Sequence, residues 1–127
     1  RNITGELLFA IAIGLLASIS SNKWAFTAAM LHLSIADGLA AVIGFGWGDT
    51  NSYKVLGHTK SIAGSTAFLV CSYLILIVYL ALGHSTTSVL TILWLPWVAT
   101  AAENISVKGT DNLIVPMAVA LALSSGI

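Results

Sequence analysis

The fold of this chain is decided by residues 37–65, which read DGLAAVIGFGWGDTNSYKVLGHTKSIAGS. The first part is an apolar helical segment with a carboxylate, Asp37, inside it. A polar hairpin follows over residues 47–60, and the pair Lys60-Ser61 then opens the next apolar segment. A carboxylate can hold a divalent metal ion, and the start of a helix can hold phosphate. This stretch therefore predicts a site for both at one end of two apolar helices.

The composition of the whole chain indicates a protein surrounded by lipid. Of its 127 residues, 57% are hydrophobic and 8% are charged, whereas a soluble domain has about 25% charged residues. The formal net charge is zero, so the chain lacks the basic surface of a nucleic-acid-binding protein. A single cysteine, Cys71, excludes an internal disulfide or a cysteine metal site. These features favour a membrane protein with no nucleic-acid partner.

Several apolar segments are long enough, or nearly so, to cross a bilayer. A span needs about 20 residues, and a single segment can cross lipid only as a helix. The predicted spans are residues 4–20, 24–46, 61–82, 87–105 and 112–126. We therefore expect an all-α fold, a polytopic integral membrane helical bundle of about five transmembrane helices. Residues 1–127 are expected to form a single transmembrane domain, and the start at Arg1 suggests an N-terminally truncated part of a longer chain.

The charges between the predicted spans indicate an orientation. One basic residue, Lys23, lies on one side of the membrane. The other four lie on the opposite side: Arg1, Lys54, Lys60 and Lys108. Because loops rich in lysine and arginine stay in the cytosol, we expect the polar hairpin to face the cytosol. The membrane would be the bacterial inner membrane, or a plastid or endoplasmic reticulum membrane in a eukaryote.

Asp37 is the strongest single indication of a functional site. A carboxylate near the middle of a membrane costs roughly 3 kcal/mol, so such residues usually line a cavity or have a partner. Asp37, Ala41, Gly44 and Gly48 recur at helical spacing and share one small face, which can hold a metal ion and a ligand. Two structural interpretations stay open. Gly44 and Gly48 also form a GxxxG packing surface, and Asp37 can instead hydrogen-bond to a neighbouring helix.

The segment KSIAGS, residues 60–65, has the composition of an anion-binding helix start. Ser61 is a good N-cap residue, the free N–H groups behind it attract phosphate, and Lys60 adds a positive charge. Gly64 lets a ligand or a helix approach closely. The other interpretation is a lysine that extends to the lipid headgroups beside an ordinary helix cap.

Further polar residues are expected on the same side of the membrane. Glu103 lies near the end of the fourth predicted span, and Asp111 and Asn112 open the fifth. These three residues can therefore join Asp37 in one site. Two simpler interpretations are an interfacial charge for Glu103 and a plain N-cap for Asp111.

Three other polar residues are not assigned to the site. Asp49 and His58 are interpreted as solvated residues of the hairpin. In an α-helix, with 100° per residue, His32 would be rotated by about 140° from Asp37. We therefore do not expect His32 and Asp37 to act together.

In these motifs the chain resembles the phytol kinase and dolichol kinase family, which is related to the phosphatidate cytidylyltransferases. The matching segments are DGLA at residues 37–40 followed by Gly44 and Gly48, KSIAGS at 60–65, and DNLIVP at 111–116 with Glu103 upstream. Each segment is weak alone, but their ordered combination over about residues 30–118 is fairly specific. The chain departs from the family pattern at Phe45, where a basic residue is usual. It also has Ala63 where many relatives have glutamate, as phytol kinase-like members do.

The resemblance implies a CTP-dependent kinase for a membrane-embedded isoprenoid alcohol of the phytol, polyprenol or dolichol type. Magnesium, or manganese, would be the metal ion. Asp37 and Lys60 would be the catalytic residues. The nucleotide would be bound by Gly44, Gly48, Lys60, Ser61, Gly64 and Ser65, and the metal by Asp37, Glu103 and Asp111, with Asn112 beside them.

Three functions besides a kinase stay open. An enzyme of the CTP:phosphatidate cytidylyltransferase type would release pyrophosphate instead of CDP. A transporter would use Asp37 as a proton or cation site and would need no phosphate-binding helix start. A non-catalytic assembly subunit would be held by the Gly44 and Gly48 face. A homo-oligomer is a separate expectation for the partners of the chain. Nucleotide binding would separate the kinase and the cytidylyltransferase from the transporter and the assembly subunit.

Overall fold

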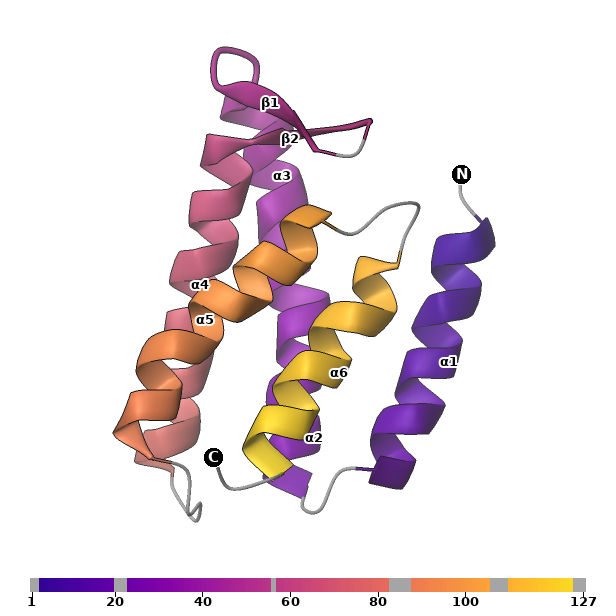
Figure 1. Ribbon diagram of the computed structural model, residues 1–127, viewed down its shortest axis with the longest axis vertical. Coiled ribbons are helices and arrows are strands. Elements are labelled where there is room, and N and C mark those ends of the chain that lie inside the picture. Colours follow the sequence, from indigo (N-terminus) through magenta and orange to yellow (C-terminus); the bar gives the residue numbers. More distant parts are fainter. Residues whose placement is uncertain (1–2, 20–22, 56, 83–87, 106–109, 125–127) are drawn as a thin grey trace.

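The structure, a computed structural model, describes residues 3–19, 23–55, 57–82, 88–105 and 110–124. It consists of apolar helices that run in alternating directions, with a small hairpin at one end (Figure 1). The elements are α1 (Ile3–Ile19), α2 (Lys23–Leu31), η1 (His32–Ala36), α3 (Asp37–Trp47), β1 (Ser52–Val55), β2 (His58–Ser61), α4 (Ile62–Ala81), α5 (Val89–Ile105) and α6 (Asp111–Ser124). Each predicted span corresponds to a helix, or to the continuous run from α2 to α3.

The expectation of an all-α chain needs one correction. Residues Ser52–Val55 and His58–Ser61 form an antiparallel two-stranded sheet, in which Tyr53 pairs with Lys60. Tyr53, Val55 and Thr59 are residue types that favour strands, and Gly57 has a positive φ of 82° at the turn. The polar hairpin predicted from the sequence is therefore a β-hairpin, and the rest of the described chain is mostly helical.

Two helical segments are long and apolar enough to cross a membrane. They are Lys23–Trp47, with 25 residues, and Ile62–Ala81, with 20 residues. The other apolar helices are shorter, at 10–17 residues: Glu6–Ile19, Val89–Ile105 and Asn112–Leu123. Length and composition thus mark two helices of the described chain as candidate spans.

The helix that carries Asp37 changes its hydrogen-bonding pattern just before that residue. His32–Ala36 form a π-helical turn, and the backbone N–H of Asp37 donates to the carbonyl oxygens of His32 and Ser34. A π-turn joins residues five apart, so Asp37 follows His32 by one turn. The rotation of about 140° between His32 and Asp37, expected from the sequence, is therefore wrong, because it assumes an uninterrupted α-helix. The side chain of His32 instead forms hydrogen bonds inside the bundle. Its Nδ1 lies 2.8 Å from Ala28 O, and its Nε2 lies 2.6 Å from Ser72 Oγ.

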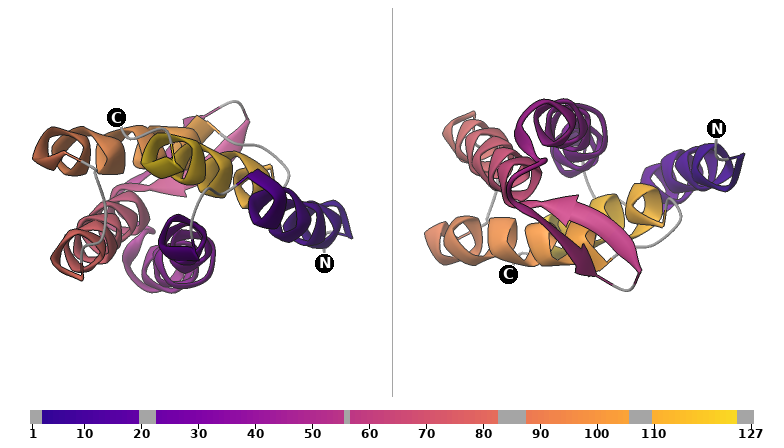
Figure 2. Two further views of the ribbon diagram at one scale, coloured as in Figure 1. Left: turned by 90° about the horizontal axis from the view of Figure 1, so that it is seen from below. Right: turned by 90° about the horizontal axis from the view of Figure 1, so that it is seen from above.

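The core of the bundle combines small and large residues. The run from α2 to α3 contributes buried alanines, and α4 contributes Phe68 and Leu76, both fully buried. Small residues let helix backbones approach closely. Helix α3 packs on α4, α4 on α5 and α5 on α6, while α1 lies at the edge of the bundle beside α6 (Figure 2). The hairpin crosses one end of this arrangement.

Many large apolar side chains point away from the core. Phe45 is 91% exposed, Trp47 69%, Leu90 67% and Val42 66%. A soluble monomer rarely exposes wide apolar patches. The apolar outer surface agrees with the lipid environment that the composition predicted.

Candidate active site

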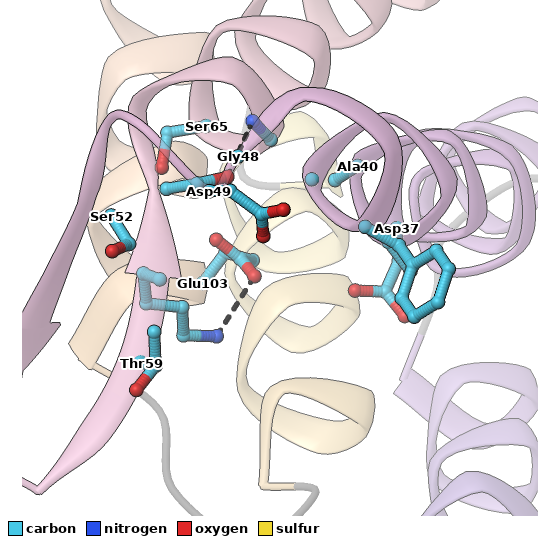
Figure 3. A pocket seen from close by; sticks show the side chains of 14 residues that line it. Asp37, Ala40, Gly48, Asp49, Ser52, Thr59, Ser65 and Glu103 are labelled. Carbon is cyan, nitrogen blue, oxygen red and sulfur yellow. Dashed lines mark hydrogen bonds and ion pairs between the residues drawn. The ribbon is translucent and has the colours of Figure 1, made fainter.

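A cavity of about 560 Å³ lies where the hairpin meets α3, α4 and α5. Figure 3 shows it from close by, with polar side chains from several elements around it. It is lined by Asp37, Ala40, Ala41, Gly44, Phe45, Gly48, Asp49, Ser52, Thr59, Lys60, Ser61, Gly64, Ser65 and Glu103. The cavity thus brings together most of the residues that the sequence singled out, although they lie up to 66 positions apart, from Asp37 to Glu103.

The predicted site residues that open α6 are not part of this lining. Asn112 lies in the first turn of α6 and is not among the residues around the cavity. The side chain of Asp111 falls outside the described part of the structure. The assignment of Asp111 and Asn112 to the site therefore stays a prediction.

The glycines hold α3 and α4 at close distance. A methyl group added to Gly64 would lie 2.9 Å from the carbonyl oxygen of Ala40, and one added to Gly44 would lie 3.1 Å from Ser61 Oγ. At Gly48 the added group would lie 2.7 Å from Ser61 Cβ. The packing role that the sequence left open for Gly44 and Gly48 is therefore present, and their contact with nucleotide stays a prediction.

The start of α4 is already hydrogen-bonded within the protein. Ser61 has extended backbone angles and its Oγ accepts from Gly64 N at 3.0 Å, so it is the N-cap that the sequence predicted. The carbonyl oxygen of Asn51 accepts from Ile62 N at 3.1 Å, and Asn51 Oδ1 accepts from Ala63 N at 3.1 Å. The first three N–H groups of the helix thus have acceptors, and the expectation of free N–H groups for phosphate does not hold. The helix dipole still favours an anion nearby.

Asn51 should be important for stability because it joins the end of α3 to the start of α4. Its Nδ2 also donates to Trp47 O at 2.9 Å. Asn51→Ala leaves two backbone groups without these partners and should lower the free energy of unfolding by about 1–3 kcal/mol. Asn51→Asp keeps an acceptor for Ala63 N and should lower the free energy of unfolding by less. Unfolding of the purified protein in detergent measures both, and equal stability of Asn51→Ala and wild type would contradict this role.

Lys60 does not stand free at the helix start but forms an ion pair. It lies on β2, and its Nζ is 3.0 Å from Glu103 Oε1 on α5. The side chains are 19% and 10% exposed, so the pair is mostly shielded from solvent. An ammonium group has three donors, and the bond to Glu103 uses one of them. Lys60 therefore retains the capacity to bind a further acceptor in the cavity.

The charged groups around the cavity are mostly acidic. Asp37, Asp49 and Glu103 contribute carboxylates and Lys60 contributes one ammonium group. Figure 3 shows these carboxylates in the pocket on different elements. The sequence did not indicate Asp49 as a site residue, because a charged residue in a polar hairpin has the pattern of a solvated loop. The balance of charge favours a cation in the cavity.

The carboxylates around the cavity offer the oxygen donors that hard divalent cations prefer. Within the described ranges, no group of three His, Cys, Asp or Glu side chains is arranged to hold a metal ion by itself. Magnesium usually binds through one or two carboxylates together with substrate phosphates, so a complete protein cage is not required. The predicted set of Asp37, Glu103 and Asp111 stays a prediction.

Two residues that no sequence motif indicated connect the hairpin with the helices. The hydroxyl of Tyr53 on β1 donates to Asn104 Oδ1 at 2.5 Å and lies 2.7 Å from Ser65 Oγ. Ser65 Oγ also donates to Asn104 Oδ1, at 3.0 Å. The sequence holds no local signal for this contact, because Tyr53 and Asn104 are 51 positions apart.

Comparison with known proteins gives one strong relationship. The chain is 35% identical over 131 aligned positions to the curated phytol kinase of Synechocystis sp., and the alignment covers 99% of this chain. The two sequences are therefore related over almost the whole of this chain. The resemblance to the phytol kinase family that the motifs predicted is thereby confirmed. No family model and no solved structure matches the chain.

The alignment with that phytol kinase covers almost all of this chain and so includes the residues that line the cavity. The chain spans about half of the length of that phytol kinase, namely 56%. One departure from the family motif lies at the cavity edge, where Phe45 is both a lining residue and 91% exposed. The cavity therefore has an apolar border at the position where the family usually has a basic residue.

Proposed function

We propose that this chain carries the nucleotide site of a membrane-bound kinase that transfers the γ-phosphoryl group of CTP to an isoprenoid alcohol. The alcohol would be of the phytol, polyprenol or dolichol type. The observation that carries the proposal is the cavity, which unites Asp37, Lys60 and Glu103 in a homologue of phytol kinase. CTP as the donor is taken from the family resemblance.

Phosphoryl transfer requires positioning and charge neutralisation more than covalent chemistry by the protein. Asp37 would hold Mg²⁺ or Mn²⁺ or orient the acceptor hydroxyl, and Glu103 and Asp49 offer further oxygen ligands. The metal ion, when bound, neutralises negative charge on the phosphates. Lys60 would bind a phosphate oxygen while Glu103 keeps its Nζ at the cavity. The acidic lining by itself disfavours nucleotide without metal, because like charges repel.

The acceptor alcohol would reach the cavity from the lipid. Phe45 lines the cavity and is 91% exposed, and Val42, one turn before it on α3, is 66% exposed. An isoprenoid chain can lie against these side chains while its hydroxyl group enters the cavity. This apolar border supports a lipid acceptor over a small soluble one.

The proposed protein crosses the membrane with its described helices. Of these, Lys23–Trp47 and Ile62–Ala81 have the length and hydropathy of spans, and we propose that α1, α5 and α6 complete a bundle of about five spans. The cavity lies at the hairpin end, which carries Lys54 and Lys60. By the positive-inside rule this end would face the cytosol, which supplies the nucleotide. A homo-oligomer stays a prediction.

A transfer assay tests the proposed function. Membranes that contain the full-length protein are incubated with CTP labelled at the γ-phosphate and with phytol, a polyprenol, dolichol or phosphatidate. We expect label in the phosphorylated alcohol and release of CDP. Pyrophosphate release with phosphatidate would instead identify a cytidylyltransferase. Absence of nucleotide binding would contradict both enzymes and favour a transporter or an assembly subunit.

A further inference from the structure

We propose that Tyr53 and Asn104 are positioning residues, which hold the β-hairpin against α5 and thereby fix Lys60 in the cavity. This inference rests on the proposed function only for its effect on nucleotide binding, since the contact itself is structural. The hairpin forms one wall of the cavity through Ser52, Thr59 and Lys60. Its position therefore determines where the ammonium group of Lys60 lies.

One rung of the hairpin makes both contacts to α5. Tyr53 and Lys60 are cross-strand partners, and directly opposed side chains lie on the same face of a sheet. Tyr53 Oη donates to Asn104 Oδ1 at 2.5 Å, and Lys60 Nζ lies 3.0 Å from Glu103 Oε1. Two neighbouring residues of α5 thus bind two paired residues of the hairpin. We call these four residues the hairpin clasp.

The direction of the hydrogen bonds in the clasp is set by Asn104. Its Nδ2 donates to Thr100 O at 3.0 Å on the same helix, which leaves Oδ1 directed to the hydroxyls of Tyr53 and Ser65. A carbonyl oxygen accepts two hydrogen bonds and each hydroxyl has one proton. Tyr53 Oη and Ser65 Oγ also lie 2.7 Å apart, and either hydroxyl can donate in that contact, so the three side chains form one hydrogen-bonded cluster.

The hairpin needs such contacts because it is small. An isolated two-stranded hairpin is marginally stable in water, and this one has four residues in each strand. Its two ends are tied to α3 and α4 by the chain itself. The clasp connects it to a third helix, so loss of the Tyr53 hydroxyl should allow the hairpin to move away from α5. Lys60 would then separate from Glu103 and from the bound phosphate.

The test compares Tyr53→Phe with Tyr73→Phe in the purified full-length protein. Tyr73 lies on α4 and its hydroxyl donates to Leu93 O on α5 at 2.7 Å. Its substitution therefore also removes one tyrosine hydrogen bond to α5, but does so away from the cavity. The first measurement is the acylation rate of Lys60 by an amine-reactive reagent, read by mass spectrometry with exposed Lys54 as the internal reference. The second measurement gives KM for CTP and kcat separately, which shows whether substrate binding or turnover is affected.

We expect Tyr53→Phe to raise both the acylation rate of Lys60 and KM for CTP by about two- to tenfold, with kcat little changed. Tyr73→Phe should change neither the acylation rate nor KM. Asn104→Leu removes the same acceptor and should behave like Tyr53→Phe. Unchanged Lys60 acylation in both clasp variants would overturn the inference, whether or not the protein is a kinase. If acylation rises but wild type transfers no phosphoryl group, the clasp stands and the proposed function fails.

Discussion

Asp37→Asn should abolish phosphoryl transfer while leaving the protein inserted in the membrane. Asparagine has nearly the same shape as aspartate but no charge, so it cannot neutralise a metal ion. A metal ion that stabilises transferring phosphoryl charge is worth several kcal/mol, so we expect the rate to fall roughly a hundredfold or more. The position of Asp37 after the π-turn and in the cavity lining supports this large effect.

The control for this experiment is Glu6→Gln, the same change of a carboxylate to an amide. Glu6 lies on α1, is exposed and is not a lining residue of the cavity. Both variants are compared with wild type for membrane content and for transfer from γ-labelled CTP. Turnover of Asp37→Asn close to that of wild type would show that Asp37 is structural and would remove it from the catalytic assignment.

Gly48→Ala should strongly destabilise the protein, whereas Gly46→Ala should not. An added methyl group at Gly48 would clash with the carbonyl oxygen of Gly44 in α3 itself and would lie 2.7 Å from Ser61 Cβ, while one at Gly46 meets nothing within 4 Å. The first change forces Ser61, the N-cap of α4, away from its place, and overpacking of this kind costs about 1–3 kcal/mol or more. Gly46 lies within α3, where alanine is favoured over glycine by about 1 kcal/mol.

Unfolding of both glycine variants in detergent measures this difference. We expect Gly48→Ala to be less stable than wild type and Gly46→Ala to be equal or more stable. Nucleotide affinity of any folded Gly48→Ala protein gives a second result, because Gly48 and the displaced Ser61 both line the cavity. Equal stability of the two variants would show that α3 and α4 can separate without loss, and would contradict the packing role of the glycines.

The sequence by itself determined the helical segments and most of the cavity. Hydrophobic runs of about 20 residues predict helices because backbone groups in lipid must be satisfied within the segment. Asp37, Gly44 and Gly48 recur at helical spacing, and Lys60 and Ser61 begin the next helix, so local periodicity was enough to place them on one end of two helices. All five line the cavity in the structure.

Only the tertiary structure decided how the polar groups of the cavity are paired. Lys60 and Glu103 are 43 positions apart, and Tyr53 and Asn104 are 51 apart, so no local pattern contains either contact. Asn51 occupies N–H groups of α4 that the sequence left free for phosphate. The π-turn before Asp37 was missed as well, because periodicity assumes a constant rotation per residue. Helices follow from short-range hydrogen bonding, whereas partners of buried polar groups depend on which helices pack together.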